Sequence, residues 1–136
     1  MTNVKPCHNS RCSICSQILE GTRYKFQCGF VFIVSDPDLN CNARDVIYVL
    51  RCTKCHAEYI GETKNLRRRM NKHISDIRHN RRLCRATDHF VKCGRFEVSD
   101  THSQFDIFIL ERQTDTKVRK AKESYFIRLF LPSMNK

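Results

Sequence analysis

Six cysteines in the first 55 residues have spacings that suit a metal ion. Three form a Cys-x4-Cys-x2-Cys run, a fourth stands alone, and the last two form a Cys-x2-Cys pair; they are Cys7, Cys12, Cys15, Cys41, Cys52 and Cys55. A Cys-x2-Cys turn presents two thiolates that can share one ion, and two such turns can complete a tetrahedral zinc site. The sequence therefore predicts zinc held by four of the six. Because a fully coordinated thiolate site leaves no open position for substrate, we expect this zinc to be structural.

Two assignments of the four ligands are open. One is a ribbon-like site that ties the N-terminal segment to a later hairpin, made of Cys12, Cys15, Cys52 and Cys55. The other lies wholly upstream of that hairpin, made of Cys7, Cys12, Cys15 and Cys41. In the second case the hairpin pair needs other partners, such as His8 or His56. The remaining cysteines have no paired spacing and are expected to be packing residues: Cys28, Cys84 and Cys93.

The compartment and the charge limit the class of protein. No apolar run approaches the roughly 18 residues of a membrane span, and the N-terminus lacks the apolar stretch of a signal peptide, so we expect an intracellular, nuclear protein without a membrane partner. Nine cysteines in a reducing compartment favour metal over disulfides, and their odd number leaves one unpaired in any disulfide scheme. The formal charge of +11, from 25 Lys and Arg against 14 Asp and Glu, favours a polyanionic partner.

The chain has two parts. Residues 1–45 are rich in loop-forming residues and are expected to form a zinc-binding segment packed on the core, with two short strands over 24–27 and 30–34. Residues 46–136 are expected to form the core itself. Its β-branched and apolar runs predict strands over 46–50, up to 61, and over 105–110, the first two joined as an antiparallel hairpin.

Two helices complete the predicted core. Asn65 can cap a helix from Leu66 to about Asn80, because apolar residues recur at spacings of four, four and three. A second helix is expected from Lys117 to Phe130, ending before a proline. The pattern predicts an α+β fold in which helices flank a small three-stranded antiparallel sheet.

The segment around residues 46–73 resembles the core of the GIY-YIG nucleases. Val46-Ile47-Tyr48 matches the first motif, with Val46 where Gly is usual, Tyr59-Ile60-Gly61 matches the second, and the basic helix over 65–73 follows. The Cys-x2-Cys between the motifs, the cysteine run upstream and the phrase that continues with Glu62-Thr63 narrow the resemblance to the nucleases of Penelope-like retroelements. The likeness covers the whole chain, most specifically residues 41–79 and 105–135.

The resemblance implies a chemistry and a set of residues. The chemistry is hydrolysis of a DNA phosphodiester with one bound Mg²⁺ or Mn²⁺, here for nicking target DNA during retroelement integration. A reverse transcriptase module in a longer parent protein is implied as a further partner, although this chain has no such motif. The residues are the paired tyrosines, a helix arginine, the histidine one turn later, the metal-binding glutamate and an asparagine twelve residues beyond it: Tyr48, Tyr59, Arg69, His73, Glu123 and Asn135.

The residues themselves support part of this assignment. Tyr48 and Tyr59 lie on adjacent strands of one hairpin, where opposed side chains approach within about 5 Å, so two phenols can converge on one water. Arg69 and His73 are four apart on one helix, where a guanidinium can neutralise phosphate charge and an imidazole can take a proton. Glu123 is the single carboxylate inside the last helix, and Mg²⁺ needs few carboxylates. Each side chain also has an ordinary structural explanation; for Glu123 it is an ion pair with the arginine one turn earlier.

A group of cations on the first helix and just after it is expected to contact DNA phosphates: Arg67, Arg68, Lys72, Arg78, Arg81, Arg82 and Arg85. The same cations would serve a rival function, a zinc-stabilised nucleic-acid-binding module without turnover. Glu123 distinguishes the two hypotheses, because a protein that only binds has no need of a carboxylate beside the tyrosines.

Overall fold

The computed structural model describes residues 2–93 and 104–135. Its centre is a three-stranded antiparallel sheet in the order β4-β3-β5, formed by β3 (Arg44–Cys52), β4 (Glu58–Asn65) and β5 (Phe105–Arg112). β3 is the central strand, and its residues 46–50 are all buried, which is why it reads as an unbroken apolar run. The three-stranded sheet, and with it the predicted α+β class, is confirmed.

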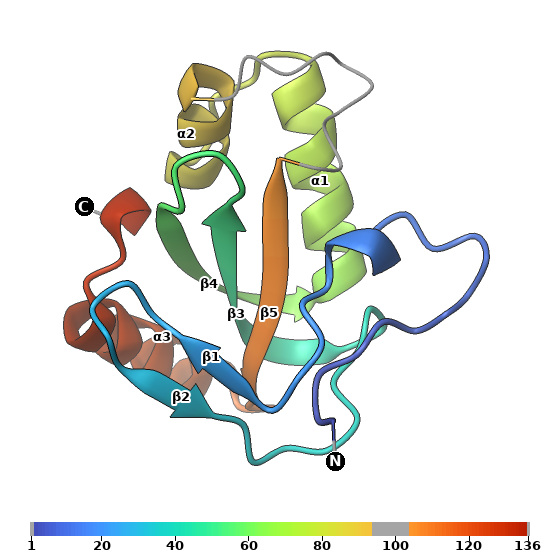
Figure 1. Ribbon diagram of the computed structural model, residues 1–136, viewed down its shortest axis with the longest axis vertical. Helices are drawn as coiled ribbons and strands as arrows, with labels where there is room; N and C mark the ends of the chain where they lie inside the picture. The colour runs from blue at the N-terminus through green and yellow to red at the C-terminus, as the bar shows by residue number, and fades with distance from the viewer. Residues whose placement is uncertain (1, 94–103, 136) are drawn as a thin grey trace.

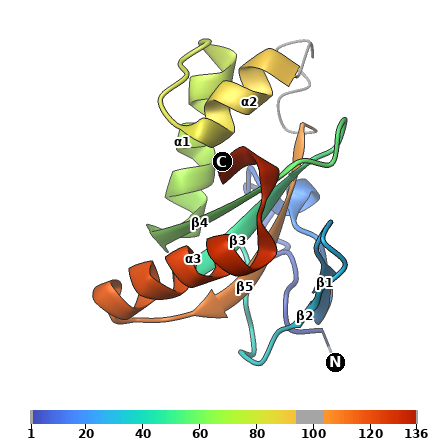
Figure 2. The ribbon, with the colours of Figure 1, turned by 90° about the vertical axis from the view of Figure 1, so that its left-hand side faces the viewer.

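Helix α1 (Leu66–Arg78) packs on one face of the sheet, and α2 (Arg85–Cys93) packs beside α1 at the end of the sheet where β3 turns into β4 (Figures 1 and 2). Asn65 caps α1 as predicted, since its side chain accepts a hydrogen bond from the Arg68 backbone N–H. The helix ends two residues earlier than expected. The helix α2 was not predicted from the sequence; Phe90 anchors it to the sheet, its ring centroid 5.0 Å from that of Phe105.

The other face carries α3 (Thr116–Phe130) and the hairpin of β1 (Arg23–Lys25) and β2 (Val31–Ile33) (Figures 1 and 2). Aromatic rings hold this layer together: Tyr24 stacks on Phe108 of the sheet, and Phe26 stacks on Phe130 of α3 at 4.1 Å. α3 begins one residue before the predicted position, with Asp115 as its cap, and ends at Phe130 as predicted.

Both edges of the sheet are occupied. Ile18, which follows the short 3-10 helix η1 (Cys15–Gln17), pairs with Ile107 of the edge strand β5. At the opposite edge, the 3-10 helix η3 (Ser133–Asn135) lies against β4. Covering an edge strand prevents its free N–H and C=O groups from pairing with another chain. No helix in the described ranges is long and apolar enough to cross a membrane.

Candidate active site

Tyr48 lies on β3 under α1 and is fully buried. Its phenol oxygen is 3.5 Å from Nε2 of His73, which projects from the buried face of α1. Burial raises the pKa of Tyr48 well above its usual range, and the nearby Arg69 guanidinium partly opposes this shift. The phenol is therefore neutral at neutral pH and faces an imidazole that can accept its proton.

Gly61 makes the position of Tyr48 possible. It stands directly opposite Tyr48 in the β3–β4 pairing, and a Cβ at this position would lie 2.5 Å from the Tyr48 hydroxyl and 3.0 Å from the ring of Tyr59. Both rings thus pass over the bare backbone of the glycine. A side chain at position 61 would have to displace them.

The two tyrosines are diagonal rather than opposed, which corrects the pairing expected from the sequence. The register pairs Tyr48 with Gly61 and Tyr59 with Leu50, so the phenols share one face at a two-residue offset. Tyr59 is half-buried, and burial raises its pKa to about 12, with the nearby Cys84 and Glu123 adding to the shift.

His73 is 4% exposed and is held neutral. Burial lowers the pKa of His73 to about 4, and the positive charge of Arg69 adds to this effect. Its other ring nitrogen, Nδ1, lies 4.0 Å from the sulfur of Cys84, at the start of the chain segment that leads into α2. Sequence spacing gives no indication that Cys84 borders the site.

Arg69 separates two hollows. One, of about 450 Å³, lies between the first turns of α1 and α3 and is lined by charged and polar residues that include Glu62, Lys64, Arg68, Lys72 and Lys120. The other, of about 240 Å³, contains Tyr59, His73 and Cys84. Arg69 and Lys72 line both. A guanidinium in this position can contact a phosphate whose neighbours extend into the basic hollow.

Glu123 approaches from α3, on the opposite face of the sheet, at the β4 edge. Burial raises the pKa of Glu123 and the charge of Glu62 adds to this shift, whereas the Glu62 backbone amide and the Arg69 guanidinium oppose it. The alternative explanation for Glu123, an ion pair with Arg119, does not hold: the 1% exposed Arg119 donates to Glu62 at 2.8 Å and is 3.3 Å from Asp45. This buried cluster fixes α3 against β3 and β4 one turn before Glu123.

Asn135 binds the backbone of β4. Its amide Nδ2 donates to the Ile60 carbonyl at 3.0 Å, and its Oδ1 accepts from the Ile60 N–H at 2.8 Å, so the side chain imitates a neighbouring strand. Ile60 lies between Tyr59 and Gly61. Asn135 is therefore close to the site through the strand that it holds, and Arg85 of α2 donates to its backbone carbonyl.

The comparison with known families agrees with this geometry. A family model described as GIY-YIG catalytic domain matches residues 45–136. The chain belongs to the GIY-YIG family. No curated protein and no solved structure matches it. GIY-YIG domains are nucleases that use divalent metals, so the chain is of the nuclease class and its substrate class is DNA.

The predicted DNA contacts of this GIY-YIG chain divide into groups. Arg68 and Lys72 line the basic hollow, together with Lys64 and Lys120, which were not among the predicted contacts. Several are exposed but hold intramolecular partners: Lys72 and Arg81 pair with the buried Asp76, Arg82 with Asp88, and Arg85 with the Asn135 carbonyl. Arg78 is an exposed residue at the end of α1, and Arg67 contacts cysteine sulfurs instead of the hollow.

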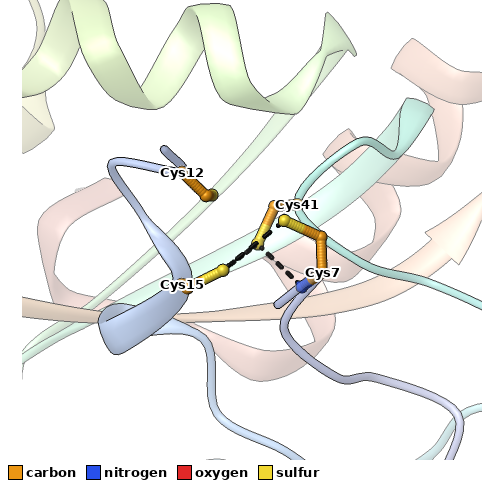
Figure 3. Close-up of side chains that lie close together, drawn as sticks. All are labelled: Cys7, Cys12, Cys15 and Cys41. Atoms are coloured by element: carbon orange, nitrogen blue, oxygen red, sulfur yellow. Dashed lines mark hydrogen bonds between the residues drawn. The ribbon is translucent and has the colours of Figure 1, made fainter. Parts of the chain in front are cut away.

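Four cysteines upstream of the GIY-YIG core converge on one point (Figure 3). They are Cys7, Cys12, Cys15 and Cys41, and their sulfurs all lie within 4.8 Å of one another. The sulfurs of Cys7 and Cys15 are 3.5 Å apart and those of Cys15 and Cys41 are 3.6 Å apart. Zn–S bonds of about 2.3 Å in a tetrahedron place sulfurs about 3.8 Å apart, so these residues fit a zinc ion. This is the second of the two predicted ligand assignments. It leaves the hairpin pair, Cys52 and Cys55, to find other partners.

The hairpin pair has partners on α2. Cys52, Cys55, His89 and Cys93 form a second group within 4.8 Å, with 3.3 Å between the Cys55 sulfur and Nε2 of His89. Cys93, which was expected only as a packing residue, packs against the core and also belongs to this candidate metal group, and the hairpin pair meets neither His8 nor His56 there. The His-x3-Cys spacing places both new members on one helix face, a signal that was available in the sequence. Cys28 is exposed on the β1–β2 turn, so the expectation that it is a packing residue is wrong, whereas Cys84 packs against the core as expected.

Proposed function

We propose that this protein is a Mg²⁺-dependent DNA endonuclease that nicks target DNA for retroelement integration. The observation that carries the proposal is the set of a buried phenol, a neutral imidazole and a second phenol on one face of the sheet, joined to a basic hollow by a guanidinium, with one carboxylate at the β4 edge. A reverse transcriptase module in a longer parent protein and a nuclear location belong to the same proposal.

In the proposed reaction Tyr48 and His73 move the proton of the attacking water. The water loses its proton to the phenol oxygen of Tyr48 while the phenol proton passes to Nε2 of His73, 3.5 Å away. The depressed pKa of His73 keeps Nε2 available as an acceptor at neutral pH. The water oxygen then bonds to phosphorus, and the leaving oxygen carries away the bonding electron pair.

Arg69 stabilises the charge that builds up on the phosphate oxygens. Its position between the two hollows allows a phosphate to bind there while the next phosphates contact Lys64, Arg68 and Lys120. A guanidinium suits this role because it donates two parallel hydrogen bonds to phosphate oxygens. Asn135 is assigned a positioning role, since both polar atoms of its side chain bond to Ile60.

Glu123 is the residue proposed to hold the divalent ion. Its half-buried carboxylate lies beside the negative charge of Glu62, and a cation at this position would offset both the burial and that repulsion. A hard ion such as Mg²⁺ accepts one carboxylate together with waters and phosphate oxygens. When bound, the ion supplies stabilisation of negative charge on the phosphate and the leaving oxygen.

The rival function is a zinc-stabilised nucleic-acid-binding module. The two four-residue metal groups and the net charge of +11 favour it equally. A nicking assay on supercoiled plasmid with and without Mg²⁺ decides, using Glu123→Ala and a filter-binding measurement on the same variant. We expect Glu123→Ala to lose cleavage and keep binding. Wild-type protein that binds DNA and never nicks it, with Mg²⁺ or Mn²⁺, would support the binding module.

A further inference from the structure

Arg67 points away from the basic hollow. It lies in the first turn of α1, two residues before Arg69, and its Nη2 donates to the sulfurs of Cys7 at 3.5 Å and Cys12 at 3.4 Å. The side chain is half-buried, and it does not line either hollow beside Arg69. Its hydrogen-bonding geometry is therefore that of a contact to a thiolate cluster.

The charge of the cluster explains why an arginine is useful there. Four thiolates and one Zn²⁺ carry a net charge of −2, whereas the second group, with three thiolates and a neutral imidazole, would carry −1. A guanidinium offsets part of the larger excess, and one nitrogen donating to two sulfurs fixes its orientation. Hydrogen bonds from outer groups to metal ligands commonly decide how firmly a metal is held.

Two more contacts tie the same cysteine segment to α1. Ser13, between Cys12 and Cys15, donates to Asn71 at 2.6 Å, and Asn71 is one helical turn after Arg67. The backbone N–H of Leu66 donates to the Ala43 carbonyl, two residues after Cys41. The N-terminal cluster thus contacts α1 at its first residue, at Arg67 and at Asn71.

We propose that Arg67 is a positioning residue that joins the N-terminal zinc site to the catalytic helix, and that it is not a DNA contact. The thiolate cluster holds the first turns of α1 through Arg67 and Asn71, and the same turns carry Arg69 toward the two hollows. Loss of this zinc, or of the Arg67 contact, therefore displaces Arg69. This inference rests on the proposed nuclease function and on structural zinc.

The test compares Arg67→Gln with Arg68→Gln in zinc-loaded full-length protein. For Arg67→Gln we expect one of two zinc equivalents to reach a chelator at least about 10-fold faster than in wild type. The single-turnover rate should fall, and the slope of log affinity for DNA against log salt should not change. For Arg68→Gln we expect normal zinc release and a slope reduced by about one. Arg67→Lys should release zinc at an intermediate rate, because it keeps the charge and loses the planar fork.

The outcomes separate the possibilities. A reduced salt slope with unchanged zinc release in Arg67→Gln would make Arg67 a phosphate contact and overturn the inference. Faster zinc release with an unchanged cleavage rate would overturn the positioning role. Should Arg67→Gln fail to fold, Asn71→Ala removes the neighbouring tether and must show the same zinc and rate effects. Zinc release and salt slope need no turnover, so they remain measurable even where the proposed nuclease activity itself fails.

Discussion

Gly61 shows at the scale of one residue how the second motif serves the first. The Tyr48 phenol packs against the backbone of Gly61, and a Cβ on Gly61 would approach the Tyr48 hydroxyl to 2.5 Å. The Tyr48 ring is fully buried beneath α1, and its hydroxyl is already 3.5 Å from Nε2 of His73. The sequence Tyr-Ile-Gly therefore supplies both a phenol and the space for the other phenol.

We expect Gly61→Ala to lower the single-turnover cleavage rate by at least about 10²-fold, because a displacement of reacting groups by an ångström costs about that much. DNA affinity and zinc content should stay near wild type, since neither the basic hollow nor the cysteines contact the methyl group. Rapid-quench cleavage at saturating DNA measures the rate. A near-normal rate would mean that Tyr48 tolerates the shift and has no demanding role.

Arg69 and Arg68 offer a comparison of neighbours with different surroundings. Arg69 is half-buried between the hollows, whereas Arg68 is exposed at the rim of the basic one. Arg69→Ala should lower the rate at saturating DNA by about 10²-fold or more with little change in affinity, because the charge it meets develops in the transition state. Arg68→Ala should weaken binding modestly and keep the rate. Equal losses in single-turnover cleavage would contradict this division.

The neutral state of His73 makes the fold sensitive to acid. Its folded pKa of about 4 lies below the ordinary value of 6.5, so the unfolded chain binds this proton first. The contribution to stability is complete above about pH 6.5 and is lost as pH falls toward 4, a loss of about 3 kcal/mol. His73→Gln, which does not titrate, should lose less stability over this range in urea denaturation. Equal losses of unfolding free energy in wild type and His73→Gln would show that protonation of His73 does not destabilise the fold. Release of zinc in acid would affect both proteins alike, so it does not disturb the comparison.

At the scale of elements, the sequence predicts what local pattern controls. The β-branched run over 46–50 and the four-residue spacing from Leu66 identify β3 and α1, and Asn65 marks the cap. α2 is only nine residues long, with a mixed series of buried residues, and its role as the other half of a metal site depends on contacts with the β3–β4 turn. The His-x3-Cys spacing of His89 and Cys93 is present in the sequence, but nothing local links it to the Cys-x2-Cys pair of the β3–β4 turn, so His89 was not among the predicted ligands.

Register and long-range side-chain contacts are also beyond the local pattern. A hairpin can be inferred from two apolar strands, but the pairing of Tyr48 with Gly61 depends on how the turn at Cys52–Cys55 is closed. In the same way, Asn135 is 75 residues from Ile60 in sequence, and only the folded chain joins them. The family resemblance marked Asn135, and the hydrogen bonds suggest what it does.

The ion pairs of Arg119 attach α3 to β3 and β4, and a substitution can measure their contribution. We expect Arg119→Met to destabilise the protein by about 3–5 kcal/mol, because the partly buried Glu62 carboxylate loses its partner. The shifted helix should also raise the Mg²⁺ concentration needed for half-maximal cleavage, since Glu123 is one turn away. Lys120→Met, at an exposed neighbour, is the matched control for stability. If Glu62→Gln added to Arg119→Met restores no stability, the unpaired carboxylate is not the cause of the loss.

At the scale of the whole molecule, one apolar core joins the elements of the fold, and two clusters of possible metal ligands lie beside it. Aromatic rings join the β1–β2 hairpin to α3. The loop at residues 7–15 and the β3–β4 turn beside α2 each contribute to a group of side chains that could hold a metal ion. Chains of this size bury a limited core, which zinc bound at these two clusters would supplement. Both clusters lie against elements that carry the site: the first on α1, the second on the turn between Tyr48 and Tyr59.

Metal removal tests this architecture directly. Purified, reduced protein should contain two equivalents of zinc per chain, and chelation should unfold it, because the free energy of binding is part of the free energy of folding. Cys12→Ser and Cys93→Ser should each lower the content by about one equivalent, since each removes one thiolate from a different group. Cys28→Ser, at an exposed thiol on a turn, should retain both equivalents.

Metal analysis by mass spectrometry measures the zinc content, and circular dichroism with increasing chelator measures unfolding. Two equivalents of zinc in Cys93→Ser would mean that α2 does not complete a site and that the hairpin pair binds zinc with other ligands. Less than about half an equivalent of zinc in the wild type would mean that zinc does not stabilise this fold.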